Sequence, residues 1–153
     1  MKVSDILRIK GNTLYTATPE QPLMDAVRAM SDKDIGSLVV MEQGRLVGML
    51  TFREVIQELV RDQGSLGATQ VRSAMVTEPL ICTPETDLDE VRRMMLGKHA
   101  RYMPVMSQRM LMGVISLYDV AKAVVDAQNF ENKMLKAYIR DWPEDEGASP
   151  PAA

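Results

Sequence analysis

The sequence predicts an α/β (α+β) fold in which one βαββα unit occurs twice, followed by a C-terminal helix. The main observation is an internal repeat, because Thr18-Pro19-Glu20 recurs 65 residues later as Thr83-Pro84-Glu85. No gap interrupts this register over residues 19–60. Two copies of a unit this small are expected to share one core around a pseudo-two-fold axis, since about 60 residues alone bury too little apolar surface. Such an axis creates a cleft with similar walls between the units.

Composition places the chain among ordinary globular proteins and excludes several classes. Of 153 residues, 46% are hydrophobic and 25% charged, and the net charge of −3 provides no basic surface for nucleic acid. The longest apolar runs are too short to span a membrane, and the first residues lack the apolar segment of a signal peptide. One cysteine (Cys82) and one histidine (His99) exclude an intramolecular disulfide and a His/Cys metal site. We therefore expect a cytoplasmic protein without a metal.

The first unit, residues 1–63, begins with a short strand at 14–17 that ends at Thr18-Pro19. Apolar residues at helical spacing predict a helix over 22–31. Strands are predicted over 37–41 and 45–51, joined by the turn Glu42-Gln43-Gly44, and a second helix over 53–60. Gly48 in the middle of a strand indicates a bulge or the close approach of another backbone or a ligand.

The second unit, residues 64–128, begins with the linker at 63–68 and repeats the pattern. Strands are predicted over 80–82, 102–106 and 110–115, with helices over 88–96 and from Leu117. A separate helix over 130–140 carries an apolar stripe, and residues 141–153 form an acidic, proline-rich tail that is predicted to be disordered. The C-terminal helix either caps the second unit or closes a homodimer.

The strand-to-helix corners are the main candidates for chemistry. They read Gly48-Met49-Leu50-Thr51-Phe52-Arg53-Glu54 and Gly113-Val114-Ile115-Ser116-Leu117-Tyr118-Asp119. A hydroxyl followed three residues later by an acid is a capping box at a helix start. The same acid can accept hydrogen bonds from a ribose diol, while the helix N-terminus meets a phosphate. Both interpretations can hold together.

The repeat resembles the cystathionine-β-synthase (CBS) domain over about residues 3–125. Met103-Pro104-Val105, followed by the second corner, matches the family pattern closely. The first unit departs from it at Val39, in place of the usual proline, and at Glu54, in place of aspartate. The resemblance implies a tandem pair, called a Bateman module, that binds adenosine-containing ligands (AMP, ADP, ATP, NAD or S-adenosylmethionine) between the repeats and often forms flat dimers.

Carried over by this resemblance, the second corner is the better site. Asp119 corresponds to the ribose-binding acidic residue, Ser116 to the hydroxyl near the ribose or phosphate, and Arg101 to the basic residue that contacts the phosphate. The adenine is expected between Val114 and residues of the first unit, which are Ile35, Gly36 and Ser37. Tyr102 and Tyr118 either stack on the base or pack at a dimer face.

The first corner is expected to bind more weakly, if at all. Thr51 and Glu54 occupy the matching positions, but Gly36 stands where the second unit has Arg101. Arg53 is the candidate substitute for that cation. The longer side chain of Glu54 alters the geometry around a ribose.

The sequence therefore predicts a regulatory ligand-sensing module, not an enzyme, that signals its occupancy to an unidentified effector protein. No Ser/His/Asp set, G-x-x-x-x-G-K-[ST] loop or G-x-G-x-x-G motif occurs. The alternative is a structural homodimerisation module with degenerate, empty nucleotide sites. The first corner favours that alternative, and the second corner argues against it.

Overall fold

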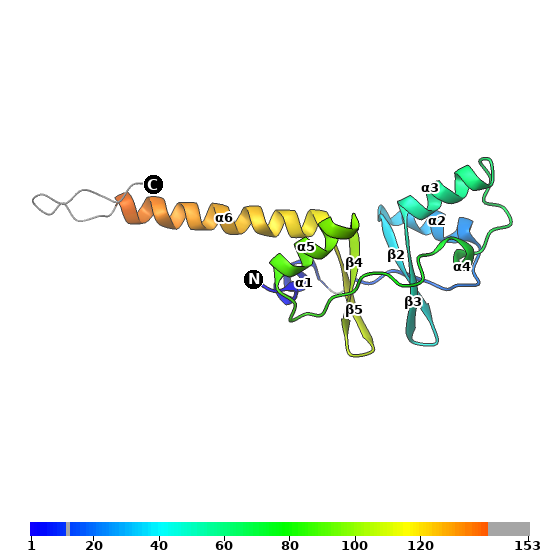
Figure 1. Cartoon of the computed structure of the whole chain (residues 1–153), viewed down its shortest axis with the longest axis horizontal. Helices are drawn as coiled ribbons and strands as arrows, with labels where there is room; N and C mark the ends of the chain where they lie inside the picture. Colours follow the sequence, from blue (N-terminus) through cyan, green and yellow to red (C-terminus); the bar gives the residue numbers. More distant parts are fainter. Residues whose placement is uncertain (12, 141–153) are drawn as a thin grey trace, which may run out of the picture.

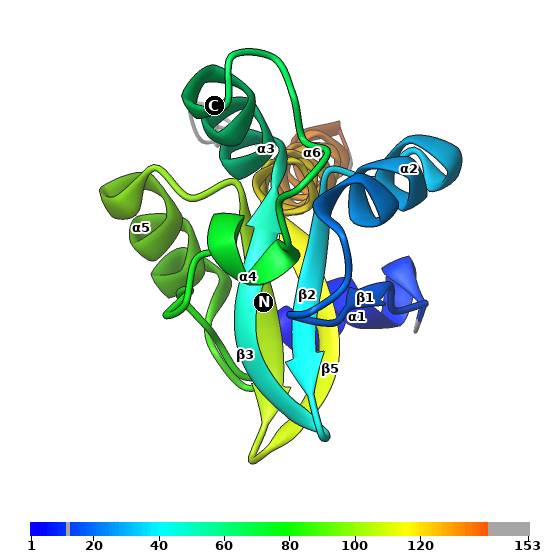
Figure 2. The ribbon, with the colours of Figure 1, turned by 90° about the vertical axis from the view of Figure 1, so that its right-hand side faces the viewer.

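The computed structural model describes residues 1–11 and 13–140. Two β-hairpins lie side by side, with helices packed around each (Figures 1 and 2). This arrangement confirms the predicted fold class of two repeated α+β units with a C-terminal helix. The predicted disordered tail, residues 141–153, lies outside the described residues.

The first unit has the predicted elements with small shifts at their ends. They are β1 (Thr16–Ala17), α2 (Leu23–Lys33), β2 (Ser37–Glu42), β3 (Arg45–Thr51) and α3 (Phe52–Arg61). β1 pairs in parallel with β2, and β2 pairs antiparallel with β3. Gln43 and Gly44 both have positive φ angles in the predicted hairpin turn, as a tight two-residue connection requires.

The second unit contains α5 (Leu88–Lys98), β4 (Tyr102–Ser107) and β5 (Met110–Ser116). The predicted strand at 80–82 is wrong, because only Cys82 makes a parallel bridge, to Val105. The Cys82 N–H donates to Pro104 O at 3.1 Å, and the Met106 N–H donates to Cys82 O at 2.8 Å. The next bond of this ladder would need an N–H at Pro104, which proline lacks. Val39 fills the corresponding position in β2, where the parallel pairing extends over two residues.

The predicted C-terminal helix over 130–140 is present, but it is not a separate element. It is the second half of α6 (Leu117–Arg140), one helix of 24 residues. No glycine or proline lies between residues 117 and 140 to end the first half. Figure 1 shows α6 projecting well beyond the body of the second unit, and Val120 is its buried residue.

Two helices were not predicted, and each packs against the other unit's elements. α1 (Val3–Lys10) packs against β5 and α6 of the second unit, while α4 (Val71–Ala74) packs against α2 and α3 of the first. The Val3 N–H donates to Thr86 O, and the Val71 N–H donates to Gln21 O, both at 3.0 Å. Gln21 and Thr86 are 65 residues apart, so the two crossings are equivalent. The pseudo-two-fold relation thus extends to segments outside the sequence repeat.

The exchange produces two cores rather than the single shared core that was expected. One contains Leu23, Met30, Leu38 and Leu50 of the first unit, completed by Val71 of α4. The other contains residues of the second unit, completed by Val3 and Ile6 of α1; its members from the second unit are Cys82, Leu88, Val91, Met95, Met103, Val105, Ile115 and Val120. Each unit therefore depends on the other's leading helix to exclude water from its core.

The mid-strand glycines lie where the exchanged segments cross, and each pairs beside a register shift in its hairpin. A Cβ at Gly113 would be 2.8 Å from Leu7 Cδ2. A Cβ at Gly48 would be 2.7 Å from Met75 Sδ and 2.8 Å from Val76 O. The bulge and the close approach predicted at Gly48 are both present. What approaches is the chain's own backbone and side chains.

Candidate functional site

A cavity of about 910 Å³ lies between the two units. Seven of the predicted site residues line it: Ile35, Gly36, Ser37, Arg101, Tyr102, Val114 and Ser116. The remaining walls come from Lys10, the connector before β1, the residue that caps α2 and the start of α6; beside Lys10 these residues are Thr13, Leu14, Tyr15, Asp34, Leu117, Tyr118 and Ala121. The second corner and the Ile35–Ser37 segment thus share one cavity. Thr51, Arg53, Glu54 and Asp119 do not line it.

The second corner forms a reciprocal capping box. The Ser116 N–H donates to Asp119 Oδ2 at 2.9 Å, and the Asp119 N–H donates to Ser116 Oγ at 3.0 Å. The capping interpretation therefore holds at this corner. Among the described residues, every recorded contact to the carboxylate of Asp119 falls on Oδ2, which leaves Oδ1 as an acceptor for another group.

Lys10 is a site residue that the sequence reasoning missed. Its Nζ donates to Asp119 Oδ2 at 2.7 Å and to Val114 O at 2.9 Å. Partial burial acts to raise the pKa of Asp119, but the hydrogen bonds and charge of Lys10, with the bonds from Ser116, outweigh it and hold that pKa below its ordinary value. Asp119 is therefore ionised at neutral pH and already paired.

A signal for Lys10 was present in the sequence. Val3, Ile6, Leu7 and Lys10 follow the i, i+3, i+4, i+7 spacing of one helical face. That pattern predicts an amphipathic helix with a cation at the end of its apolar stripe. It does not predict that this helix packs on the second unit.

The first corner is closed on itself. Glu54 Oε1 accepts from the N–H of Thr51 at 3.0 Å and from Thr51 Oγ1 at 2.9 Å. Only 6% of Glu54 is exposed. The Arg53 N–H also donates to Thr51 Oγ1, at 3.2 Å. Capping thus accounts for the contacts made by these side chains.

Gly36 marks a second difference between the corners. A Cβ at this position would overlap the hydroxyl of Tyr102 and lie 3.1 Å from a ring carbon of Phe52. Tyr102 therefore occupies the space that a side chain at the first-unit counterpart of Arg101 would need. This packing requires glycine and removes any cation from that place.

Arg101 is exposed, lines the cavity, and has no ion pair within residues 1–11 and 13–140. A free guanidinium in a cavity wall can bind an anion. His99 is exposed and caps the C-terminus of α5 in the left-handed conformation, as Asp34 does for α2. Burial raises the pKa of Cys82 to about 12, which is consistent with a buried, inert thiol.

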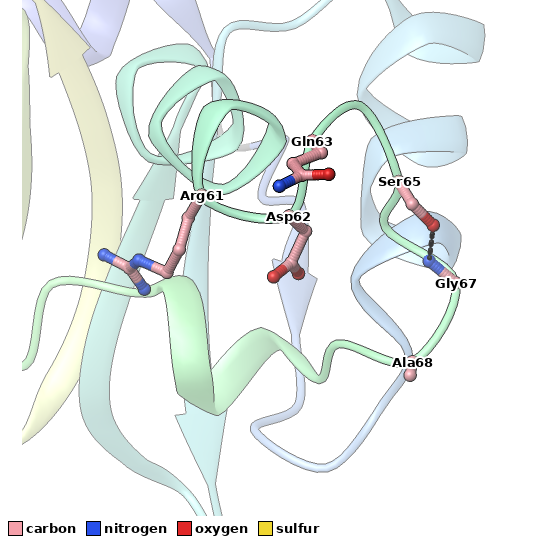
Figure 3. Close-up of a pocket in the computed structure, with 6 residues that line it drawn as sticks. All are labelled: Arg61, Asp62, Gln63, Ser65, Gly67 and Ala68. Carbon is pink, nitrogen blue, oxygen red and sulfur yellow. Dashed lines mark hydrogen bonds between the residues drawn. The ribbon is translucent and has the colours of Figure 1, made fainter.

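A smaller hollow of about 380 Å³ lies on the linker that follows α3 (Figure 3). Its lining residues are Arg61, Asp62, Gln63, Ser65, Gly67 and Ala68. Ser65 Oγ accepts from the Gly67 N–H at 3.3 Å, while Arg61 is paired with Glu58 at 3.0 Å. Figure 3 shows Arg61 directed away from Ser65 and Gly67. No predicted site residue lies here, so the inter-unit cavity is the candidate site.

In the part of the chain that the structure describes, no cluster of His, Cys, Asp or Glu could hold a metal ion. Within the same residues, no helix combines the length and apolar character that a membrane crossing needs.

Comparison with known proteins identifies the repeats. The CBS domain family model matches residues 3–61 and again 71–126. The mitochondrial CBS domain-containing protein CBSX3 of Arabidopsis thaliana is 30% identical over 147 residues, covering 90% of this chain and 71% of its own. A solved structure of a protein with CBS domains from Burkholderia ambifaria has a TM-score of 0.78 and 30% identity, covering 84% of this chain and 96% of its own.

Two more distant structures share the fold and were solved with ligands. The CBS domain pair of protein MJ0100, in complex with 5′-methylthioadenosine and S-adenosyl-L-methionine, has a TM-score of 0.74 at 19% identity. It covers 83% of this chain and 98% of its own. CBSX2 in complex with AMP has a TM-score of 0.68 at 22% identity, with coverage of 83% and 98%.

Proposed function

The chain belongs to the CBS-domain family, and on that premise we propose that it is a regulatory module that binds an adenosine-containing ligand in the inter-unit cavity. The observation that carries the proposal is the meeting of Arg101, Ser116 and Val114 with residues 35–37 around one cavity. Its volume of about 910 Å³ falls within the range of about 300–1,000 Å³ that small-molecule sites occupy. Relatives with the same fold bind AMP or S-adenosylmethionine.

Each part of such a ligand has a matching group. The adenine lies between the apolar side chains of Val114 and Ile35, with Tyr102 and Tyr118 at the cavity wall. The ribose diol donates to Asp119, whose Oδ1 remains available beside the Ser116 cap. Arg101 then meets a 5′ phosphate, and a charge-assisted bond of this kind contributes about 1.5–3 kcal/mol.

The output of binding is regulation rather than chemistry. The functional groups around the cavity bind and orient a ligand, and neither His99, which caps α5, nor the buried thiol of Cys82 is among its lining residues. We therefore propose that occupancy alters the contact between this module and an effector protein. A buried free thiol fits a reducing compartment such as the cytoplasm.

The proposal is tested by titrating the protein calorimetrically with AMP, ADP, ATP, NAD and S-adenosylmethionine, with GMP as the base control. At 100 times its dissociation constant, the bound ligand stabilises the fold by about 2.7 kcal/mol, visible as a thermal shift. Adenine-specific binding supports the proposal. If no adenosine compound gives heat or a thermal shift, the proposal is contradicted. That result would favour a structural module with empty sites. The closed first corner already favours an empty site in the first unit.

We also propose that the module is a homodimer joined through the distal half of α6. Phe130, Met134 and Leu135 are 64%, 58% and 44% exposed on that half. Apolar stripes of this kind mark interfaces, and two-fold pairs are the commonest assembly.

The double variant Phe130→Ser/Met134→Ser should be monomeric by light scattering, with its helical circular dichroism retained. Gln128→Ser, on the same exposed half, is the control. A double variant that stays dimeric would move the interface to the faces of α2, α3, α5 and the first half of α6.

A further inference from the structure

Lys10 occupies a position in the cavity that the proposed function does not use. The side chain lies at the C-terminal end of α1 and is 43% exposed. An ammonium group has three N–H donors. Two are taken by Val114 O and Asp119 Oδ2, and the third has no acceptor among the residues that the structure describes.

The ammonium is held in place by the packing of its helix. Val3 and Ile6 are buried in the second core, and Leu7 lies against Gly113. The Gly11 N–H closes the last turn on Leu7 O at 3.0 Å. These contacts place Lys10 beside β5 before any ligand arrives, so little conformational entropy is lost when it contacts one.

The charges that face the cavity favour an anion. Lys10 and Arg101 are its cationic lining residues, and Asp34 is its acidic one. Asp119 is not among the lining residues, and its carboxylate is already paired with Lys10. A ligand whose 5′ group is anionic therefore meets two cations, whereas a sulfonium group at the same place would be repelled by both.

We infer that Lys10 is a specificity-determining residue that selects adenosine ligands with an anionic 5′ group, contacting the phosphate through its third N–H. This inference rests on the proposed function and names the ligand class of the same site. The first corner lacks such a group, because α4 ends at Ala74 and Glu54 accepts only from Thr51 among the described residues.

The test compares AMP with adenosine, which lacks the phosphate, on the full chain. Lys10→Met should weaken AMP binding about 10-fold, as expected for a lost charge-assisted hydrogen bond, while adenosine affinity changes less than about 3-fold. Lys10→Arg should keep most of the preference for AMP. Arg8→Met is the matched control, since it removes a cation from the same helix that, among the described residues, pairs only with Asp5 and does not line the cavity.

The outcomes separate the two claims. If AMP and adenosine weaken in parallel in Lys10→Met, Lys10 acts only by orienting Asp119 and the inference is overturned. The inference is also overturned if Lys10→Met binds both compounds as the wild type does. It is overturned as well if Arg8→Met reduces the preference for AMP as much as Lys10→Met does. If the wild-type protein binds S-adenosylmethionine but not AMP, the inference is overturned and the proposed function stands. If it binds no adenosine compound at all, the proposed function itself fails, and a wild type that binds both AMP and adenosine keeps that function whatever Lys10→Met does.

Discussion

The two corners of this protein have nearly the same sequence pattern and different surroundings. At Thr51–Glu54 the acid turns back onto its own helix start and is buried. At Ser116–Asp119 the same capping box leaves one carboxylate oxygen available and lies beside a cavity with two cations. The difference comes from neighbours that lie far away in sequence. The repeated motif therefore specifies a helix start twice, and only its second copy lies beside the candidate site.

The neighbours that make the difference come from the other unit. Tyr102 of the second unit fills the space beside Gly36 of the first, and Lys10, on the leading helix of the first unit, reaches Asp119 of the second. Neither residue has a similar residue at the equivalent position across the pseudo-axis. The first-unit residue that corresponds to Tyr102, for example, is Ser37. Four experiments test how far this asymmetry extends.

The largest expected effect is that of Asp119→Ala on ligand affinity. Two hydroxyl bonds to a carboxylate are lost, which predicts weakening of at least about 100-fold. Isothermal titration with AMP measures it, and circular dichroism checks that α6 is retained. The matched control is Glu54→Ala at the equivalent position. An Asp119→Ala affinity within a few-fold of wild type would remove the second corner from the site.

Second in size is the difference between the two crossing glycines. Gly48→Ala places a methyl group against the backbone oxygen of Val76, which cannot move freely, and should destabilise the fold by about 1–3 kcal/mol. Gly113→Ala meets only the tip of Leu7 and should cost less than about 1 kcal/mol. Urea unfolding curves measure both. Equal losses would show that the two crossings are equally rigid.

Glu54→Ala tests the capping role of the first corner. The loss of its bonds to Thr51 should lower the unfolding free energy by about 0.5–2 kcal/mol. AMP affinity should change less than about 3-fold, because the Glu54 carboxylate is buried and turned onto Thr51. If calorimetry instead finds two equal sites, or the same affinity loss as in Asp119→Ala, the ranking of the corners is wrong.

The smallest expected effect is the pH dependence of the link between Lys10 and Asp119. The pKa of Asp119 is lower in the folded protein than in the unfolded chain. Its stabilisation is therefore present above the unfolded-state pKa and lost as pH falls through the folded-state value.

Comparing wild type with Lys10→Met by thermal unfolding from pH 7 to pH 2 measures this link. The difference in stability should be under about 1 kcal/mol at neutral pH, because Lys10 is partly exposed, and should shrink in acid. A difference that persists at pH 2 would assign the stabilisation to the bond from Lys10 to Val114 O, or to packing, instead.

The sequence predicted the repeated elements because their periodicity and turns are local signals. The hairpin at Gln43 and Gly44 and the buried stripe of α2 follow directly from them. The length of the strand at 80–82 was overestimated. Its prediction followed the first unit, where Val39 has the backbone N–H that Pro104 lacks. The helix over 130–140 was predicted as separate, but it continues from the preceding helix because nothing in the sequence interrupts α6.

The sequence predicted those parts of the candidate site that local motifs encode. Arg101, Val114 and Ser116 meet residues 35–37, as the pseudo-axis required. Lys10 was missed because α1 and α4 are out of the 65-residue register, with Val3 matching Val71. Which core a helix completes is a tertiary property, and the amphipathic pattern of α1 fits either one.

The exchange of α1 and α4 also has a consequence for synthesis. A ribosome delivers the first unit's strands and helices by Arg61, but its core stays open until Leu66 and Val71 emerge. α1, made before the strands of either unit, gains its first partners only when Pro84 and Thr86 emerge, and Lys10 meets Asp119 when α6 follows. The second core thus closes last and draws the N-terminus across the finished first unit. Such long-range closure slows folding, and in a nascent chain arrested between the repeats the apolar face of α1 has nothing to pack against.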